Sequence, residues 1–199
     1  MIILQTSNQI DLWQQSNISF KQTLAQYSPK LQAQLIHTSL GSMIAIGDNS
    51  NLYMLEFTDK NNIENKITKL MLVAKSSIIA GSNLSIESIT LELNAYFNNS
   101  LQKFCTPVRL LGTDFQKLVW QELMLIPYAC IASYKAQSQA INNPAAYRAV
   151  ANANAANMLL IIVPCHRVVR SDLSLGGYGA GIARKKWLLD HERCVFRAG

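Results

Sequence analysis

The residues with the clearest chemical potential lie in one short run, Pro164-Cys165-His166-Arg167-Val168. A cysteine is a nucleophile only as the thiolate, and a nearby histidine or other positive group favours that form. The run follows Met158–Val163, six consecutive apolar residues that predict a buried strand. Adjacent strand residues point to opposite faces, so a contact between the Cys165 thiol and the His166 imidazole requires a bend or a bridging water. A buried structural cysteine explains the same position from spacing alone.

The other three cysteines show no pattern of their own. Cys105, Cys130 and Cys194 form no C-x-x-C pair, and their spacing fits neither a zinc site nor a disulfide framework, so no metal site is expected. The segment from Met1 to Asn8 lacks the features of a secretory signal. We therefore expect a cytoplasmic protein with free thiols. No stretch approaches 18 apolar residues, so no membrane span is expected.

Three helices are predicted before the reactive run. Thr113 or Asp114 can cap the first, which begins at Phe115 and ends at Pro127. Ser133 can cap a second helix that reaches about Ile141. The turn Asn142-Asn143-Pro144 separates it from a third helix over 145–156. Two short helices joined by a tight turn suggest a helix-turn-helix.

The third helix has an unusual composition, because 7 of its 12 residues are alanine. Alanine allows a helix backbone to approach a neighbour closely, so an ordinary packing helix would explain it. Arg148 is a single long cation on this low-profile helix, and it favours a helix that approaches a polyanion.

The first half of the chain predicts mixed α and β structure. Ser42–Gly47 and Leu52–Phe57 predict a hairpin with a four-residue turn. Asn62–Val73 has apolar residues at helical spacing. Ser85 can cap a further helix that ends at Asn98-Asn99-Ser100. Residues 104–112 lack periodicity and predict a linker.

Composition and charge limit the class of protein. Of the 199 residues, 49% are hydrophobic and 15% charged, which excludes a disordered or coiled-coil chain. Residues 1–100 hold 6 Lys/Arg against 7 Asp/Glu, and residues 101–199 hold 12 against 5, so the surplus of the +6 net charge lies in the second half. Such asymmetry indicates a polyanion partner for that half, although a basic surface also serves solubility.

The run Pro164-Cys165-His166-Arg167-Val168-Val169 resembles the active-site signature of the O6-alkylguanine-DNA alkyltransferases, also called methylated-DNA–protein-cysteine methyltransferases. The resemblance extends over residues 104–192 with the family's spacing. Its further motifs are Gly112–Gln116, Val119-Trp120, Ile126-Pro127, Ser133-Tyr134, Pro144, Arg148–Val150, Asn157, Gly177-Tyr178, Arg184-Lys185, Leu188-Leu189 and His191-Glu192.

The resemblance implies a two-domain α/β (α+β) fold. Residues 1–103 would form an N-terminal mixed α/β structural domain, ribonuclease H-like. Residues 104–199 would form a C-terminal, winged helix-turn-helix-like DNA-binding domain that carries the active-site cysteine. The partner implied is double-stranded DNA carrying O6-alkylguanine, with O4-alkylthymine as a second lesion. No membrane, no obligate protein partner and no cofactor are implied.

The resemblance also implies how DNA is bound. Arg148 would enter the base stack and replace the alkylated guanine, which rotates out of the duplex. Ala149, Ser133, Tyr134, Arg184 and Lys185 would contact DNA. The extruded base would enter a pocket lined by Val163, Pro164, Tyr178 and Gly179.

For the transfer itself, the resemblance implies an attack of Cys165 on the alkyl carbon. His166 would take the thiol proton through a water, and Glu192 would hold and polarise that histidine. Tyr134 would donate a proton to the departing guanine. Asn157 would hold the turn between the third helix and the active-site strand. The thioether product does not reverse, so each molecule would act once, as a methyltransferase that consumes itself.

Some residues depart from the family pattern. Ala129 and Asn142 stand where glycine is usual, and alanine is strained there if its φ is positive. Gln137-Ser138 replace Leu-Ala, which predicts looser packing of the second helix. Leu173 replaces a hairpin glycine, and Gly179-Ala180 replace the usual small lid residues.

Three other functions stay open at this point. A DNA-binding sensor would flip the lesion without repairing it, although relatives of that kind lack the cysteine. A transcriptional regulator would carry a further metal-binding cysteine cluster. A cysteine hydrolase would turn over repeatedly.

Overall fold

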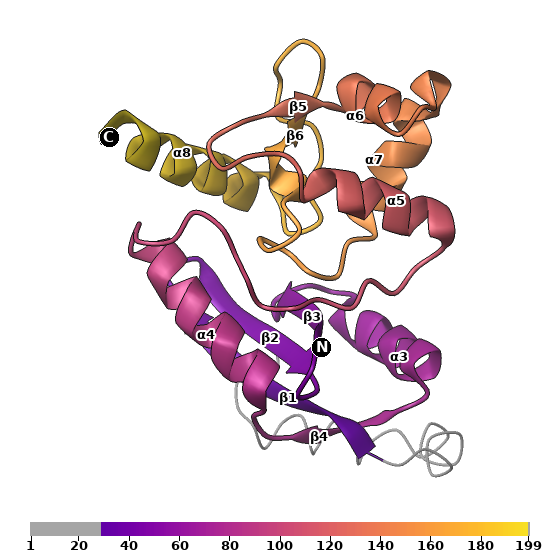
Figure 1. The fold of residues 1–199 in the computed structure, drawn as a ribbon, viewed down its shortest axis with the longest axis vertical. Coiled ribbons are helices and arrows are strands. Elements are labelled where there is room, and N and C mark those ends of the chain that lie inside the picture. The colour runs from indigo at the N-terminus through magenta and orange to yellow at the C-terminus, as the bar shows by residue number, and fades with distance from the viewer. Residues whose placement is uncertain (1–28, 199) are drawn as a thin grey trace. The chain divides into compact units, whose positions relative to one another are not determined.

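The computed structural model describes residues 29–198, and the first eight residues, on which the expectation about a secretory signal rested, lie outside this range. Internal contacts divide the chain into two compact units, with the division between Leu111 and Gly112. Each unit is described by itself (Figure 1). The fold class is confirmed, because the first unit is mixed α/β and the second is mainly helical. No helix in the described range has the length and apolar character needed to cross a bilayer.

The first unit contains a four-stranded sheet with the order β3-β2-β1-β4. The predicted hairpin is confirmed as β2 (Gly41–Gly47) and β3 (Leu52–Phe57), which pair antiparallel. β1 (Pro29–Thr38) pairs antiparallel with β2 and parallel with β4 (Ser77–Ala80). Met43 to Gly47 are all buried, so β2 is covered on both faces.

Two helices cover this sheet. α3 (Ile63–Ala74) contacts β3, and α4 (Leu84–Phe97) packs on β1 and β2 (Figure 1). The prediction of Ser85 as the cap of α4 is wrong. Asn83 is the N-cap and accepts the Ile86 N–H, because its extended backbone places the side chain over the first turn. Ser85 is buried within the helix.

Residues 104–111 are anchored to the first unit. Val108 forms a parallel bridge with Leu52, at which the Leu52 N–H donates to Pro107 O and the Arg109 N–H donates to Leu52 O, both at 2.8 Å. The Glu92 carboxylate on α4 accepts bonds from the N–H of Cys105 and from Thr106. The linker therefore lies along edge strand β3.

The second unit begins with the predicted helices. Thr113 caps α5 (Asp114–Leu123) in a capping box with Gln116. Ser133 caps α6 (Tyr134–Ala140), and a 3-10 turn, η1 (Pro144–Ala146), leads into α7 (Tyr147–Ala155). α5 ends at Leu123, earlier than the predicted stop at Pro127. Two short parallel strands, β5 (Ala132–Ser133) and β6 (Val168–Val169), and the long helix α8 (Ile182–Ala198) complete the unit.

The prediction of a strand over 158–163 is wrong. The segment forms successive turns, with Ile161 at φ 73° and the Val163 N–H bonded to Leu159 O. Its side chains are mostly buried, so the apolar run reflects burial and not pairing with another β-strand. Cys165 then begins a second 3-10 turn, η2 (Cys165–Arg167).

The predicted loosening around Gln137 and Ser138 is also wrong. Both side chains are buried and bonded. The Gln137 Nε2 donates to Val119 O, and its Oε1 accepts from Asn154 Nδ2 at 2.8 Å. These bonds join α6 to α5 and α7, and the Trp120 indole N–H donates to Ala153 O at 2.8 Å. Polar contacts thus join the three helices beside the buried apolar residues Val119, Trp120, Leu123 and Val150.

Positive φ values occur at three of the departures, so the condition for the strain predicted at Ala129 is met. Ala129, Asn142 and Leu173 have φ values of 60°, 55° and 67°. Asparagine accepts this region more readily than alanine or leucine, so Ala129 and Leu173 carry the larger cost.

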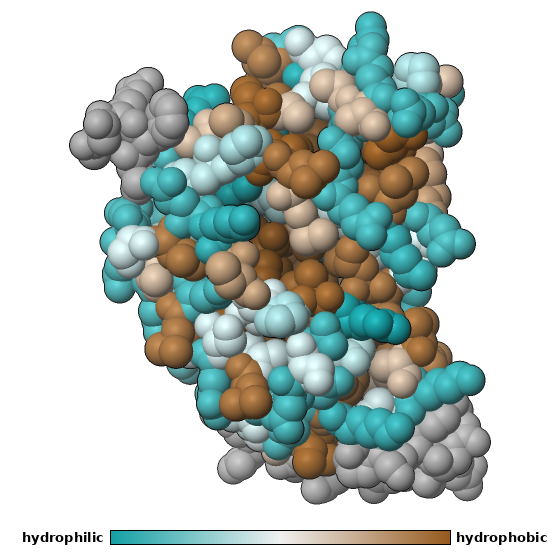
Figure 2. Space-filling view, viewed as in Figure 1, coloured by the Kyte–Doolittle hydropathy of each residue, from teal (hydrophilic) through white to brown (hydrophobic). Residues whose placement is uncertain are grey.

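Large apolar side chains also reach the surface, and Leu91, Leu125 and Leu173 are each 72% exposed. On the face in Figure 2, hydrophobic residues lie among hydrophilic ones. Single exposed apolar side chains such as these three leucines are ordinary for proteins.

Candidate active site

Cys165 lies at the start of η2 with its side chain 4% exposed. The Asn157 amide holds it in place. Asn157 Nδ2 donates to Val163 O at 2.8 Å and contacts Cys165 Sγ at 3.3 Å, and its Oδ1 accepts the Leu159 N–H. A donor directed at sulfur favours the thiolate over the thiol. The predicted role of Asn157 in shaping this turn thus has a geometric basis, although the segment that it shapes is not a strand.

His166 is the next residue on the turn, and it is fully buried. Its Nε2 lies 2.8 Å from Glu192 Oε1. Burial lowers the pKa of His166, against the opposing effect of Glu192, so the ring is neutral at pH 7. An ionised carboxylate can only accept, so Nε2 carries the proton and Nδ1 is left with a lone pair. Nδ1 is buried and has no hydrogen-bond partner among the described residues.

Glu192, on α8, is the centre of a buried ionic cluster. Its carboxylate accepts two bonds from Arg167, with Nε to Oε2 at 3.0 Å and Nη2 to Oε1 at 3.1 Å. Ala129 N–H donates to Oε2 at 3.2 Å. Burial alone would raise the pKa of Glu192, but the bonds from His166 and Arg167 outweigh it and lower the pKa to about 2. The carboxylate is therefore ionised at neutral pH.

Lys185 does not have the predicted role. We expected a DNA contact, but its side chain is fully buried and its ammonium donates to Val168 O and Gly177 O. The ammonium also lies 5.8 Å from the centre of the Tyr134 ring. Burial lowers the pKa of Lys185 to about 8, although a Cys165 thiolate would act to raise it. Lys185 thus joins β6 to the loop that carries Gly177.

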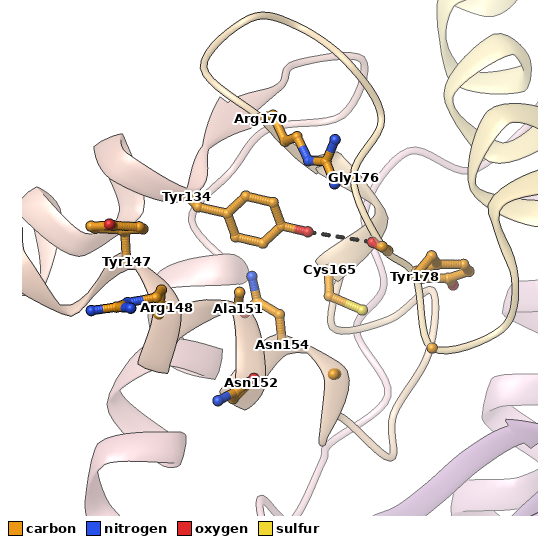
Figure 3. A pocket seen from close by; sticks show the side chains of 13 residues that line it. Tyr134, Tyr147, Arg148, Ala151, Asn152, Asn154, Cys165, Arg170, Gly176 and Tyr178 are labelled. Atoms are coloured by element: carbon orange, nitrogen blue, oxygen red, sulfur yellow. Dashed lines mark hydrogen bonds between the residues drawn. The ribbon is translucent and has the colours of Figure 1, made fainter.

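A cavity of about 560 Å³ opens beside Cys165 (Figure 3). Arg148 and Tyr147 from α7 lie on one side, and Tyr178 lies on the other (Figure 3). The described residues that line the cavity are Tyr134, Tyr147, Arg148, Ala151, Asn152, Asn154, Ala155, Cys165, Arg170 and Gly176 to Gly179.

Tyr134 projects into this cavity from the first turn of α6 (Figure 3). Its hydroxyl donates to Gly177 O at 3.3 Å. Burial is the main cause that raises the pKa of Tyr134, and the nearby Cys165 adds to it, while Arg170 opposes both. The phenol therefore keeps its proton at neutral pH and can act as a donor. Gly176 has φ +65°, and a side chain there would meet the Tyr134 ring at 3.2 Å, so glycine leaves room for the tyrosine.

The other predicted pocket and DNA residues divide into two groups. Tyr178 and Gly179 line the cavity. Val163 and Pro164 do not line it, because both are buried beneath the turn, and the Val163 carbonyl is instead bonded to Asn157. Arg148 and Ala149 are exposed, with Asn152 and Ala155, on one face of α7. Ser133 caps α6 with its side chain, and Arg184 donates to Ala180 O at 3.3 Å.

Sequence reasoning missed several residues of this site. Tyr147 and Arg170 line the cavity, and the Arg148 guanidinium lies 5.9 Å from the centre of the Tyr147 ring. The position of Tyr147 beside Arg148 in the sequence was a usable signal. Arg167 was assigned only to the motif, and its two bonds to Glu192 required the fold.

Comparisons with known proteins agree with this geometry. A family model described as "6-O-methylguanine DNA methyltransferase, DNA binding domain" matches residues 114–194. A methylated-DNA–protein-cysteine methyltransferase of Mycobacterium leprae is 34% identical over 163 residues, which cover 82% of this chain and 93% of that protein. One of Mycobacterium tuberculosis is 48% identical over 102 residues, which cover 51% of this chain and 62% of the relative's length.

A solved structure is similar as well. The crystal structure of Mycobacterium tuberculosis OGT in complex with DNA matches with a TM-score of 0.72 and 33% identity, over 82% of this chain and 94% of that one.

Proposed function

Because the chain belongs to the methylated-DNA–protein-cysteine methyltransferase family, we propose that it repairs DNA by moving an alkyl group from O6 of guanine to its own Cys165. The observation that carries this proposal is the cavity beside Cys165. The Cys165 sulfur accepts a hydrogen bond from Asn157, and the next residue, His166, forms a buried hydrogen-bonded pair with Glu192. A binding protein has no need of an activated thiol at the wall of its pocket.

The thiol is activated by its neighbours. His166 Nδ1 bears a lone pair because Glu192 fixes the proton on Nε2. It takes the Cys165 proton through a water, and Glu192 stabilises the imidazolium that forms. The Asn157 amide stabilises the thiolate.

The reaction then balances in one displacement. The thiolate forms a bond to the alkyl carbon while the bond from that carbon to guanine O6 breaks. Tyr134 donates its proton to the departing guanine, which leaves neutral, and Arg170 and Lys185 offset the charge left on the phenolate. The thioether remains on the protein, so each molecule acts once and no cofactor takes part.

DNA binding is assigned to the second unit, and the first unit is assigned a structural role. The exposed face of α7 carries Arg148 among small or short residues, which suits close approach in the minor groove. Arg148 takes the place of the extruded guanine, whose base enters the cavity. The duplex with O6-alkylguanine is the proposed partner, with O4-alkylthymine as a second lesion.

A lesion sensor is the second candidate, because the cavity and α7 would serve it equally well. The experiment that separates the two is mass spectrometry of the protein after exposure to duplex DNA containing O6-methylguanine. We expect one added methyl group on the Cys165 peptide and transfer that stops at one per molecule. Retained binding without this methyl group would favour the sensor, and continued turnover would favour a hydrolase.

A further inference from the structure

Arg170 is a cation of the cavity wall that the transfer mechanism leaves without a binding role. It follows β6, and its side chain is exposed. Its stem passes Gly176, where a side chain would lie 3.5 Å from Arg170 Cγ. In Figure 3 its guanidinium lies near Gly176, on a different wall from Arg148. No hydrogen bond or ion pair to the Arg170 guanidinium is found within residues 29–198.

The turn that carries Arg170 is held by its own bonds. The Arg170 N–H donates to Ser174 O at 2.9 Å, and the Leu173 N–H returns to Arg170 O at 3.0 Å. The Asp172 carboxylate accepts from both the N–H and the hydroxyl of Ser174. Asp172 is the carboxylate nearest in sequence. Its hydrogen bonds are both to Ser174, and the Arg170 charge acts on it only at longer range, where it helps to lower the pKa of Asp172. Arg170 is therefore presented to the cavity by a closed turn and not by a loose loop.

One positive charge of the cavity wall has no ligand assigned to it. Among the described lining residues, the charged ones are Arg148 and Arg170, and none is acidic. Arg148 is assigned to the base stack. Of the other cations nearby, Arg167 binds Glu192 and Lys185 is buried, whereas Lys135, Arg184 and Lys186 do not line the cavity.

A nucleotide that turns its base into this cavity brings its own phosphates to the rim. The phosphate carries a full negative charge, and a guanidinium binds phosphate through two parallel N–H···O bonds. We propose that Arg170 binds a backbone phosphate next to the extruded nucleotide and so holds the base in the cavity. This inference rests on the proposed function, since it requires a nucleotide that leaves the duplex.

The test is a cycle between protein and DNA. The duplexes carry one neutral methylphosphonate on the 5′ or the 3′ side of O6-methylguanine. Their affinity is measured for Cys165→Ser proteins with and without Arg170→Ala. The transfer rate is measured separately, for wild type and Arg170→Ala with Cys165 present. We expect Arg170→Ala to weaken binding about tenfold, which is the order of a lost charge-assisted pair, and to reduce the salt slope by about 0.9. One methylphosphonate should weaken wild type by a similar factor and Arg170→Ala by less than twofold.

Two controls separate this role from others. Lys117→Ala removes the same charge from an exposed position on α5 that does not line the cavity, and it should respond to the methylphosphonates as wild type does. Arg170→Lys keeps the charge but lacks the two parallel N–H donors of the guanidinium, so its affinity should lie between those of wild type and Arg170→Ala. Arg170 also affects the pKa of Tyr134, and this effect would change the transfer rate on both substrates. The phosphate contact is made only with duplex, so Arg170→Ala should reduce the rate with free O6-alkylguanine base at least fivefold less than the rate with duplex.

The outcomes that overturn the inference are distinct. Arg170→Ala binding within twofold of wild type, methylphosphonate effects as large in Arg170→Ala as in wild type, or equal rate losses on free base and duplex would each exclude it. Failure of the proposed function is seen separately, as no methyl group on the wild-type Cys165 peptide. The binding cycle still decides the role of Arg170 in that case.

Discussion

The imidazole of His166 and the carboxylate of Glu192 form a 2.8 Å hydrogen bond between two side chains that are almost fully buried. This bond joins η2 to α8, which lie far apart in sequence. It fixes which nitrogen of the ring bears the proton, and it keeps a charge in the interior of the second unit. The charge has a measurable consequence for stability.

We predict that acid weakens the fold through Glu192. Its pKa is about 2 in the folded protein against an ordinary 4.5, so the unfolded chain binds the proton first. The stability from this group is complete above about pH 5 and is lost as pH falls towards 2, roughly 3 kcal/mol in all. Urea unfolding of wild type and Glu192→Gln between pH 3 and pH 7 measures the contribution of Glu192 to the free energy of unfolding.

Glu192→Gln should be less stable at pH 7 by about 3–5 kcal/mol, because Arg167 stays buried without its partner, and should have a shallower dependence on acid. Asp190→Asn removes an exposed carboxylate of the same helix and should keep the wild-type dependence. Identical slopes in wild type and Glu192→Gln would contradict the prediction.

The second prediction concerns the nucleophile. Cys165→Ser should abolish methyl transfer, because an alcohol is not deprotonated by this neutral imidazole to a useful extent, and should leave affinity for duplex DNA within about threefold. Asn157 can bond to the serine oxygen as it does to the sulfur. Label transfer and fluorescence anisotropy measure the two effects. Transfer that persisted would point to Cys105, Cys130 or Cys194.

The third prediction concerns Arg148. Arg148→Ala should slow transfer from duplex DNA by roughly 30-fold, because no side chain then fills the vacated position and offsets the few kcal/mol that extrusion of the base costs. The rate with free O6-alkylguanine base should fall much less, because no base has to be replaced. Single-turnover rates on both substrates check this, with Lys117→Ala as the charge-matched control. An equal loss on both substrates would refute the role in extrusion.

The fourth prediction compares two adjacent lysines of α8. Lys185→Met should lower the free energy of unfolding by about 2–4 kcal/mol, because two carbonyls lose charge-assisted bonds. Lys186→Met should change it by less than about 0.5 kcal/mol, because that lysine is exposed and paired only with exposed Asp190. Thermal unfolding distinguishes them, and equal small effects would show that the bonds of Lys185 contribute little.

Local signals in the sequence were sufficient for some of these features. The cap Ser133 and the turn at Asn142 are set by short-range backbone chemistry, so they were predicted correctly, and Thr113 was one of the two caps predicted for α5. The apolar run 158–163 was misread because burial in a turn and burial in a strand give the same pattern.

Longer-range features were not accessible from the chain alone. A fully buried lysine such as Lys185 contradicts the ordinary expectation that cations are exposed. The position of Arg170 on the cavity wall depends on how the turn after β6 folds back past Gly176. Neither position is revealed by the residues that adjoin it in the sequence.

The attachment of residues 104–111 to the first unit has a practical consequence for any attempt to express the two halves of the chain apart. A cut after residue 103 would take Thr106 away from Glu92 and would uncover the edge of β3 at Leu52. An uncovered strand edge invites pairing with another chain. A cut after Leu111 keeps the bridge between Val108 and Leu52, so we expect the first half to aggregate less when the gene is divided there.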